Sequence, residues 1–324
     1  MKCLGFAWLI AVGAGCSFPS YLIKAEDDSE GGMGGSGGRE VTAGAGATAG
    51  TSAGATTGGS PGGGSGSNPS AGVAGMAGSG ATGGTPMELA PIGVPGKWQL
   101  TLEDEFVGEA LDQSKWITYM LIGDSAFREW GARDEWIADE NVQLQDGECV
   151  LTAENEPTNN HPYTSGGVNS AGLFEQEFGY FEARIRFPLG KGFWGVWALR
   201  SLAGFPPAIE GVNVLGGQPS RATSGYWFQG AGGAELVRYE GTTDYTNGYH
   251  VFGIDWQPTS ITFYVDGALL QVLDDPEERV RGPLYPSVNL SISAADSGDP
   301  VPDETTPWPG EVRIDWIRVY QRVE

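Results

Sequence analysis

Apolar and polar residues alternate in many short runs along the chain after residue 90. Glycine, proline, asparagine or aspartate follows most runs, and these residues favour turns. We find no long stretch with the 3.6-residue period of an amphipathic helix. The alternating runs are Val142–Leu144, Cys149–Ala153, Tyr180–Phe187, Gly225–Phe228, His250–Trp256, Ile261–Val265, Ser287–Ile292 and Val312–Tyr320. Many short strands separated by turns predict an all-β sandwich or barrel over residues 90–324.

The first residues have the pattern of an export signal. A basic Met1-Lys2 start precedes an uncharged apolar stretch from Cys3 to Gly15. This stretch has the length of a secretory signal and is too short to span a bilayer. We therefore expect residues 1–15 to be a signal peptide and the protein to be secreted.

The end of this signal resembles a bacterial lipobox, in which a small residue precedes a cysteine that is lipidated after cleavage. The residues are Val12-Gly13-Ala14-Gly15-Cys16, and they depart from that motif at Gly13, where an aliphatic residue is usual. We expect lipidation of Cys16, which would anchor the protein at the bacterial cell envelope or surface. The alternative is an ordinary signal peptide that is cut after a small residue.

Residues 16–89 form the next segment, and residues 31–85 in it are mostly Gly, Ala, Ser and Thr. Such a composition cannot bury a core, so we expect a flexible tether. Its root-mean-square reach as a coil is roughly 40 Å. The tether would hold the globular domain, residues 90–324, away from the anchoring surface.

Charge and cysteine content narrow the possible partners. The formal net charge is −23, which disfavours nucleic acid, anionic membrane surfaces and acidic polysaccharides as partners. A lipid anchor would then be the membrane contact, and we expect a monomer. The cysteines are Cys3, Cys16 and Cys149, without the spacing of a disulfide framework. We expect Cys149 to be a buried strand thiol.

Short motifs in a fixed order give the domain a resemblance to a known family. They are Trp98–Phe106, Leu111–Trp116, Glu140–Val142 with Asp146-Gly147 and Leu151–Ala153, Tyr163–Gly166, Phe178–Arg186, Tyr249–Trp256 with Phe263–Gly267, and Ile314–Tyr320. Together they resemble glycoside hydrolase family 16, the laminarinase, lichenase and agarase group. The resemblance implies a concanavalin A-like jelly roll, in which two antiparallel sheets bend around a concave carbohydrate groove. It also implies a polysaccharide ligand, and the acidic charge favours a neutral β-glucan or galactan.

The stretch from Phe205 to Gly217 resembles the catalytic strand of this family. The family has Glu-x-Asp-x-x-Glu, an aromatic residue and then Leu-Gly-Gly. Placing Leu215-Gly216-Gly217 on the last three puts Ala208 at the nucleophile, Glu210 at the middle acid and Asn213 at the acid/base. A retaining glycosidase needs two carboxyls about 5–5.5 Å apart. We therefore expect a polysaccharide-binding domain with impaired catalysis.

Other functions stay open at this stage. Glu210 is the only carboxylate between Glu182 and Glu235, so a shifted alignment does not restore two acids. An active endo-β-glycanase would need a displaced acid from a loop, and the candidates are Asp134, Glu135, Asp296 and Asp299. A structural cell-surface module without a sugar ligand is the further alternative.

Aromatic residues supply the candidate sugar contacts, because an indole plane buries the CH face of a sugar. For any one tryptophan, packing in the core is an equal alternative. The family's second groove tryptophan falls at Ala198 without a gap or at Trp197 with one deletion, and it often has His at Phe228. The candidate substrate-binding residues are Trp130, Trp194, Trp197, Glu210, Trp227 and Phe228.

The resemblance also implies a structural calcium ion on the convex face. The family's ligands map to Glu105, the carbonyl of Gly147 and Asp315. Carboxylate and carbonyl oxygens suit calcium. The alternative is that the two acids are solvated or paired with basic residues.

Overall fold

The computed structural model describes residues 90–129, 133–230, 233–241, 243–274, 280–294 and 300–323. The expected signal peptide, tether and lipidation site at Cys16 lie outside these residues, as does Trp130. Strands make up almost all of the regular structure that is described, which confirms the all-β prediction. Nowhere in these ranges is there a helix with the length and apolar character needed to cross a membrane.

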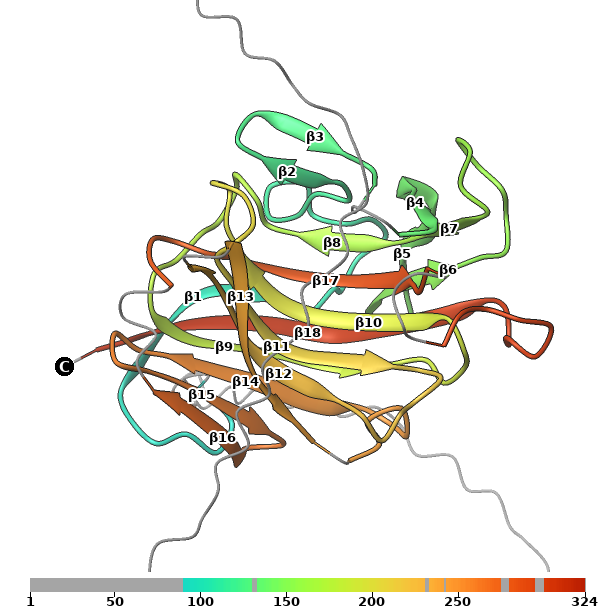
Figure 1. Ribbon diagram of the computed structural model, residues 1–324. Coiled ribbons are helices and arrows are strands. Elements are labelled where there is room, and N and C mark those ends of the chain that lie inside the picture. Colours follow the sequence, from blue (N-terminus) through green and yellow to red (C-terminus); the bar gives the residue numbers. More distant parts are fainter. Residues whose placement is uncertain are drawn as a thin grey trace, which may run out of the picture. The chain divides into compact units, whose positions relative to one another are not determined.

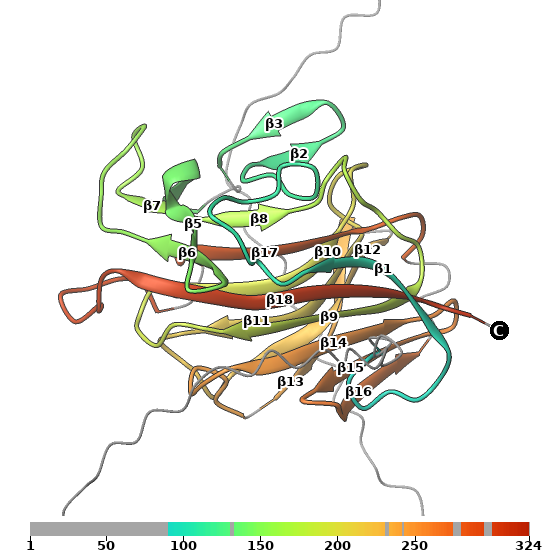
Figure 2. The same cartoon turned by 180° about the vertical axis from the view of Figure 1, so that it is seen from behind.

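An eight-stranded antiparallel sheet, here called the outer sheet, has the order β16-β15-β14-β9-β18-β6-β5, and β1 also pairs with β18 (Figures 1 and 2). Long strands at its centre carry the alternating runs of the sequence. Its strands are β1 (Trp98–Asp104), β5 (Val142–Gln145), β6 (Glu148–Ala153), β9 (Gly179–Arg186), β14 (His250–Trp256), β15 (Ser260–Val265), β16 (Ala268–Asp274) and β18 (Gly310–Arg322).

A six-stranded antiparallel sheet, here called the site sheet, packs against the outer sheet and has the order β13-β12-β11-β10-β17-β8. Its strands are β8 (Gly167–Asn169), β10 (Phe193–Arg200), β11 (Ala208–Leu215), β12 (Thr223–Gly230), β13 (Gly233–Glu240) and β17 (Tyr285–Ile292). The smaller elements are the hairpin β2 (Met120–Ile122) and β3 (Ser125–Phe127), the parallel pair β4 (Glu135–Ile137) and β7 (Tyr163–Ser165), and the short 3-10 helix η1 (Asp139–Asn141). In Figure 1 both small pairs lie beyond β17 and β8, at the edge of the site sheet.

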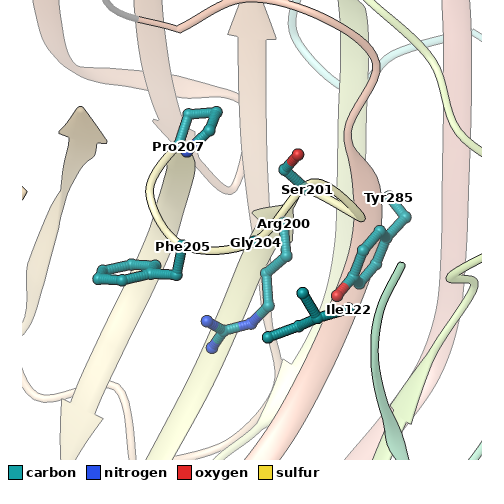
Figure 3. A pocket seen from close by; sticks show the side chains of 7 residues that line it. All are labelled: Ile122, Arg200, Ser201, Gly204, Phe205, Pro207 and Tyr285. Atoms are coloured by element: carbon teal, nitrogen blue, oxygen red, sulfur yellow. The ribbon is translucent and has the colours of Figure 1, made fainter. Parts of the chain in front are cut away.

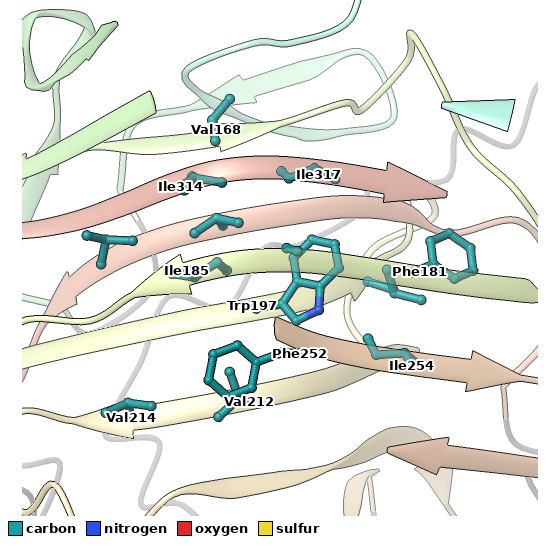
Figure 4. Packing of buried hydrophobic residues seen from close by; sticks show 14 of the residues in the cluster. Val168, Phe181, Ile185, Trp197, Val212, Val214, Phe252, Ile254, Ile314 and Ile317 are labelled. Carbon is teal, nitrogen blue, oxygen red and sulfur yellow. The ribbon is translucent and has the colours of Figure 1, made fainter. Parts of the chain in front are cut away.

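One apolar core fills the space between the two sheets (Figure 4). Alternate residues of each strand enter it, so Trp197 and Val212 of the site sheet meet Phe181 and Ile254 of the outer sheet. All four are at most 2% exposed. Burial of one such side chain contributes roughly 1.5–3 kcal/mol before conformational entropy is counted. Cys149 is also fully buried in this core, as expected from the sequence.

A second, smaller apolar cluster covers the other side of the outer sheet. Val94 and Trp98, at the beginning of the domain, pack there with Tyr180 and Tyr320. Glu182 lies beside them, fully buried, and accepts hydrogen bonds from the Ile92 backbone N–H and the Tyr320 hydroxyl, each at 3.2 Å. Burial raises the pKa of Glu182 to about 7, because the apolar surroundings disfavour the charged form.

Candidate functional site

A β-bulge in β11 decides which side chains share a face of the site sheet. Trp197 of β10 pairs with Val212 and Ala198 pairs with Glu210, so Gly211 is one extra residue on β11. A Cβ atom at Gly211 would lie 2.6 Å from Trp197 Cδ1, so a glycine is needed at this close approach. The extra residue shifts the alternation by one position along the strand.

The bulge gathers Ala208, Glu210 and Asn213 on the side of β11 away from the core. Ile209 and Val212 belong to the core cluster, and the residues beside them therefore point outward. We call this side of strands β8, β17, β10, β11 and β12 the site face. The resemblance implies a concave carbohydrate groove, which we expect on this face.

Hydrogen bonds link four side chains across three strands of the site face. Asn213 Nδ2 donates to Glu210 Oε2 at 2.8 Å, and Trp227 Nε1 of β12 donates to Glu210 Oε1 at 2.9 Å. Trp194 Nε1 of β10 donates to Asn213 Oδ1 at 3.0 Å. Asn213 is 5% exposed, so its two bonds are made away from bulk water. An amide suits this position because it donates to the carboxylate and accepts from the indole at once.

The space around Ala208 contains a cation. In register, Ala208 lies between Arg200 of β10 and Trp227 of β12, and it is 1% exposed. The Arg200 guanidinium donates to Asn289 Oδ1 at 3.2 Å. Burial lowers the pKa of Arg200, and the negative charge of Glu210 acts in the opposite direction. Ala208 therefore presents a methyl group at the position that the resemblance assigns to the nucleophile, opposite an arginine on the neighbouring strand.

Arg200 also lines a small pocket, together with the loop after β10 and two residues from other elements. In this pocket the arginine lies between Phe205 on one side and Ile122 and Tyr285 on the other (Figure 3). The ring of Phe205 in turn contacts Trp227, with 5.2 Å between the ring centres.

Glu210 is the only Asp or Glu in the strands that carry the site face, β8, β17, β10, β11 and β12. Among the loop candidates for a displaced acid, Asp296 and Asp299 lie outside the described residues. Asp134 lies near Tyr163, whose pKa is raised by burial and further by the negative charge of Asp134. Glu135 is 1% exposed and accepts a hydrogen bond from the Ile292 backbone N–H at 3.0 Å. Burial raises its pKa to about 7.

Two of the predicted sugar-binding tryptophans do lie on the site face. Trp194 and Trp227 are both half-buried, with their N–H groups bonded within the site. The guanidinium carbon of Arg133 lies 3.5 Å from the ring centre of Trp194, so it covers one face of that indole. A sugar that stacks on this face must take the place of Arg133.

Two other predicted contacts were wrong, because the residues point to the core. Trp197 is fully buried between the sheets. Phe228 packs against the same core, with its ring 6.1 Å from that of Tyr226, two residues earlier on the same side of β12. Ala198, where the alignment without a gap places the family's second groove tryptophan, pairs with Glu210 and lies on the site face.

Sequence analysis missed the two arginines of the site. Arg200 lies six residues after Trp194 on the same strand, and strand alternation alone would have placed both on one face. Arg133 lies in a loop before β4, and the sequence carries no signal for its contact with Trp194.

The predicted calcium ligands are paired with arginines in this structure. Glu105 lies 2.7 Å from Arg318, and Asp315 lies 2.5 Å from Arg184. Gly147 occupies the tight turn between β5 and β6 with φ +79°. Within the described ranges, groups of three or more His, Cys, Asp or Glu that could hold a metal are absent. Calcium would therefore have to replace both arginines as the partner of the carboxylates, and the site stays a prediction.

Comparison with known proteins identifies the family. The model of glycosyl hydrolases family 16 matches residues 132–318, more than half of the chain. The chain belongs to glycosyl hydrolases family 16. The catalytic domain of an endo-1,3-beta-glucanase (laminarinase) from Thermotoga petrophila superposes with a TM-score of 0.61 and 28% identity, over 71% of this chain and 100% of that one.

Curated proteins of this family are similar at a comparable level. Glucan endo-1,3-beta-glucosidase A1 of Niallia circulans is 28% identical over 74% of this chain, and the match covers 39% of its own length. A beta-glucanase of Rhodothermus marinus is 27% identical over 70% of this chain and 86% of its length. The chain spans about two fifths or less of the first curated relatives it matches. Family 16 membership explains the jelly roll.

Proposed function

We propose that the domain binds a neutral polysaccharide on its site face and does not cleave it. The observation that carries the proposal is the set of bonds to Glu210. This residue is the one carboxylate in the five site-face strands, and Asn213 and Trp227 occupy both of its oxygens. The relatives named as glucanases support a glucan as the ligand class, and a galactan is the neutral alternative.

Each step of the retaining reaction needs a functional group that this site lacks. A nucleophile must attack the anomeric carbon, and Ala208 has no functional group to do so. A proton donor must protonate the leaving oxygen, and the Asn213 amide does not transfer protons near neutral pH. Removal of a nucleophile alone typically lowers the rate by factors on the order of 10⁴–10⁶.

Binding does not depend on the missing carboxyls. Trp194 and Trp227 flank the Glu210–Asn213 pair on neighbouring strands, and each is partly exposed. Indole rings bind sugars through apolar contact with few rotors to immobilise. Glu210 and Asn213, on the strand between the two rings, and Asn289, on β17, add polar groups for sugar hydroxyls.

Export would place this binding domain at the cell surface. The proposed sequence of events is removal of residues 1–15, lipidation of Cys16 and display of the domain on the tether of residues 16–89. The substitution Cys16→Ser tests the anchor. It should move the protein from the membrane fraction to the soluble one, and unchanged partitioning and precursor processing would contradict lipidation.

Retention on insoluble glucans tests the binding function. The full chain should be depleted from solution by curdlan or another insoluble neutral glucan or galactan. Trp194→Ala should weaken this by about tenfold, since truncation of a central aromatic contact in a binding site typically costs more than about 1 kcal/mol. Trp316→Ala, on the outer sheet, is the matched control. A wild-type protein that no neutral polysaccharide retains would favour a structural cell-surface module instead.

One observation favours a second candidate, an active endo-β-glycanase with a displaced acid. The Glu135 carboxyl, with a pKa of about 7, holds a proton near neutral pH as a general acid must. Its 1% exposure and its bond to the Ile292 backbone N–H leave this carboxyl little access to a bound sugar. If the wild type released reducing sugar and Glu135→Gln abolished that release, this second function would replace the first.

A further inference from the structure

A second cavity lies away from the site face, where β9 ends and β18 begins. It has a volume of about 320 Å³. Arg186 to Leu189, which leave β9 for β10, form one wall, and Pro307, Pro309 and Glu311 form another, with Thr246 at the edge. This volume is at the lower end of the range for small-ligand pockets, roughly 300–1,000 Å³.

The cavity contains a positive charge in an acidic protein. The outer sheet carries a row of arginines here, and the neighbours of Arg186 are neutralised: Arg184 pairs with Asp315 at 2.5 Å and Arg313 pairs with Glu148 at 3.1 Å. For Arg186, the contact found among the described residues is with the ring of Tyr249, 5.6 Å from its centre, and not with a carboxylate. Glu311 lines the cavity, but its Oε2 accepts from Arg313 Nε at 2.8 Å.

The remaining walls are apolar and rigid. Pro188, Pro307 and Pro309 present ring surfaces, and Leu189 is 59% exposed. Proline has little conformational freedom to lose when a ligand packs on it. Thr246 already donates its hydroxyl to Asp244 at 2.7 Å, so its oxygen is left as an acceptor.

We propose that this cavity is a second binding site and that it takes a sugar carrying a carboxylate, a hexuronate residue. The carboxylate pairs with the planar Arg186 guanidinium, a geometry that allows two parallel hydrogen bonds. The sugar ring packs on the prolines and Leu189, while its hydroxyls donate to Thr246 and to the second oxygen of Glu311. A single uronate carries one charge, so the acidic domain repels it far less than a polyanion.

A pair of matched ligands tests this charge recognition on the unaltered full chain. Methyl glucuronide and its methyl ester have the same ring, and the ester removes the charge. Saturation-transfer NMR should show binding of the acid at least about tenfold tighter than that of the ester, since a hydrogen bond to a charged group contributes roughly 1.5–3 kcal/mol. Equal affinities would overturn the proposal without any variant.

Variants then locate the site. Arg186→Gln keeps the length and hydrogen bonding of the side chain, and it should abolish the preference for the acid. Arg221→Gln, a surface arginine paired with Glu240 elsewhere, should leave the preference intact. A neutral glucan that occupies the site face should not displace the uronate. Displacement, or an unchanged preference in Arg186→Gln, would show that the uronate binds elsewhere and contradict the assignment.

Discussion

Asn213 Nδ2 lies 2.8 Å from Glu210 Oε2, and it donates a hydrogen bond to this residue, the one carboxylate of the site-face strands. The resemblance places the acid/base carboxyl of a family 16 enzyme at the position of Asn213. Here Glu210 is the hydrogen-bond acceptor, and Asn213 is its donor. The pair is thus a satisfied structural unit, stabilised further by Trp194 and Trp227.

The first prediction concerns this pair. Asn213→Asp should lower the melting temperature at about pH 7, at a cost of about 1–3 kcal/mol, because two carboxylates then meet without a donor. The repulsion raises a folded-state carboxyl pKa above its unfolded value. The lost stability should therefore return as the pH falls through this raised pKa towards about 4, because one acid of the pair becomes protonated.

Asn289→Asp is the matched control on the same face. Asn289 accepts from the Arg200 guanidinium, so a carboxylate there gains an opposite charge. We expect no loss of stability at neutral pH. Equal melting temperatures for wild type and Asn213→Asp at neutral pH would contradict the described bond.

The second prediction concerns Arg133, which lies over one face of the Trp194 indole. Arg133→Ala should strengthen binding of a neutral glucan by roughly two- to tenfold, because the sugar no longer competes with a cation–π contact of about 0.5–2 kcal/mol. Titration calorimetry of both proteins with a soluble oligosaccharide measures the effect. Arg128→Ala removes a nearby arginine that pairs with Asp139, and it should leave the affinity unchanged. Weaker binding by Arg133→Ala would show that Arg133 contacts the sugar instead of covering its platform.

Strand alternation in the sequence was sufficient to predict the position of a strand where one side of that strand lies entirely in the core. β9, β14, β17 and β18 coincide closely with the alternating runs for this reason. The bulge at Gly211 has no such signature, because a one-residue shift exchanges the two faces of a strand. The face of Trp197 could therefore not be decided from the sequence.

Contacts between distant segments were also beyond the sequence. The position of Arg133 on Trp194 depends on a loop that packs onto β10, and no periodic pattern encodes it. By contrast, the family motif singled out Ala208, Glu210 and Asn213 in the sequence, and the structure has all three on one face of β11.

The third prediction concerns Glu182, the carboxyl buried beside the first residues of the domain. The pKa of Glu182 is raised to about 7 in the folded state, so folding favours its protonated form. Its contribution to stability is present below the unfolded pKa of about 4.3 and is lost as the pH rises through about 7. Glu182→Gln has no charge to bury. Relative to wild type it should gain up to roughly 3 kcal/mol between about pH 5 and pH 8.

Thermal unfolding at several pH values checks this gain. Glu103→Gln, at a half-buried position of β1, serves as the control and should shift the melting temperature equally at all pH values. A Glu182→Gln profile parallel to that of the wild type would rule out a buried ionisable group at this position.

The fourth prediction concerns calcium on the outer sheet. We propose that calcium replaces Arg184 and Arg318 as the partner of Asp315 and Glu105, and ligand binding to the folded state should then raise the melting temperature. Asp315→Asn should abolish the rise, whereas Asp303→Asn, at a distant ion pair with Lys191, should retain it. Identical melting curves in calcium and in chelator would contradict calcium binding, and both carboxylates would then stay paired with their arginines.

The central claim is that this family 16 domain has lost catalysis at Ala208 and Asn213, and turnover tests it most directly. The unmodified full chain, incubated with laminarin, lichenan or agarose, should release no reducing sugar above a heat-inactivated control. Ala208→Glu combined with Asn213→Glu should return trace activity, because both carboxyls act as one unit and either change alone leaves the pair incomplete. Robust hydrolysis by the unmodified protein, unaffected by substitution of Ala208 or Asn213, would contradict the account.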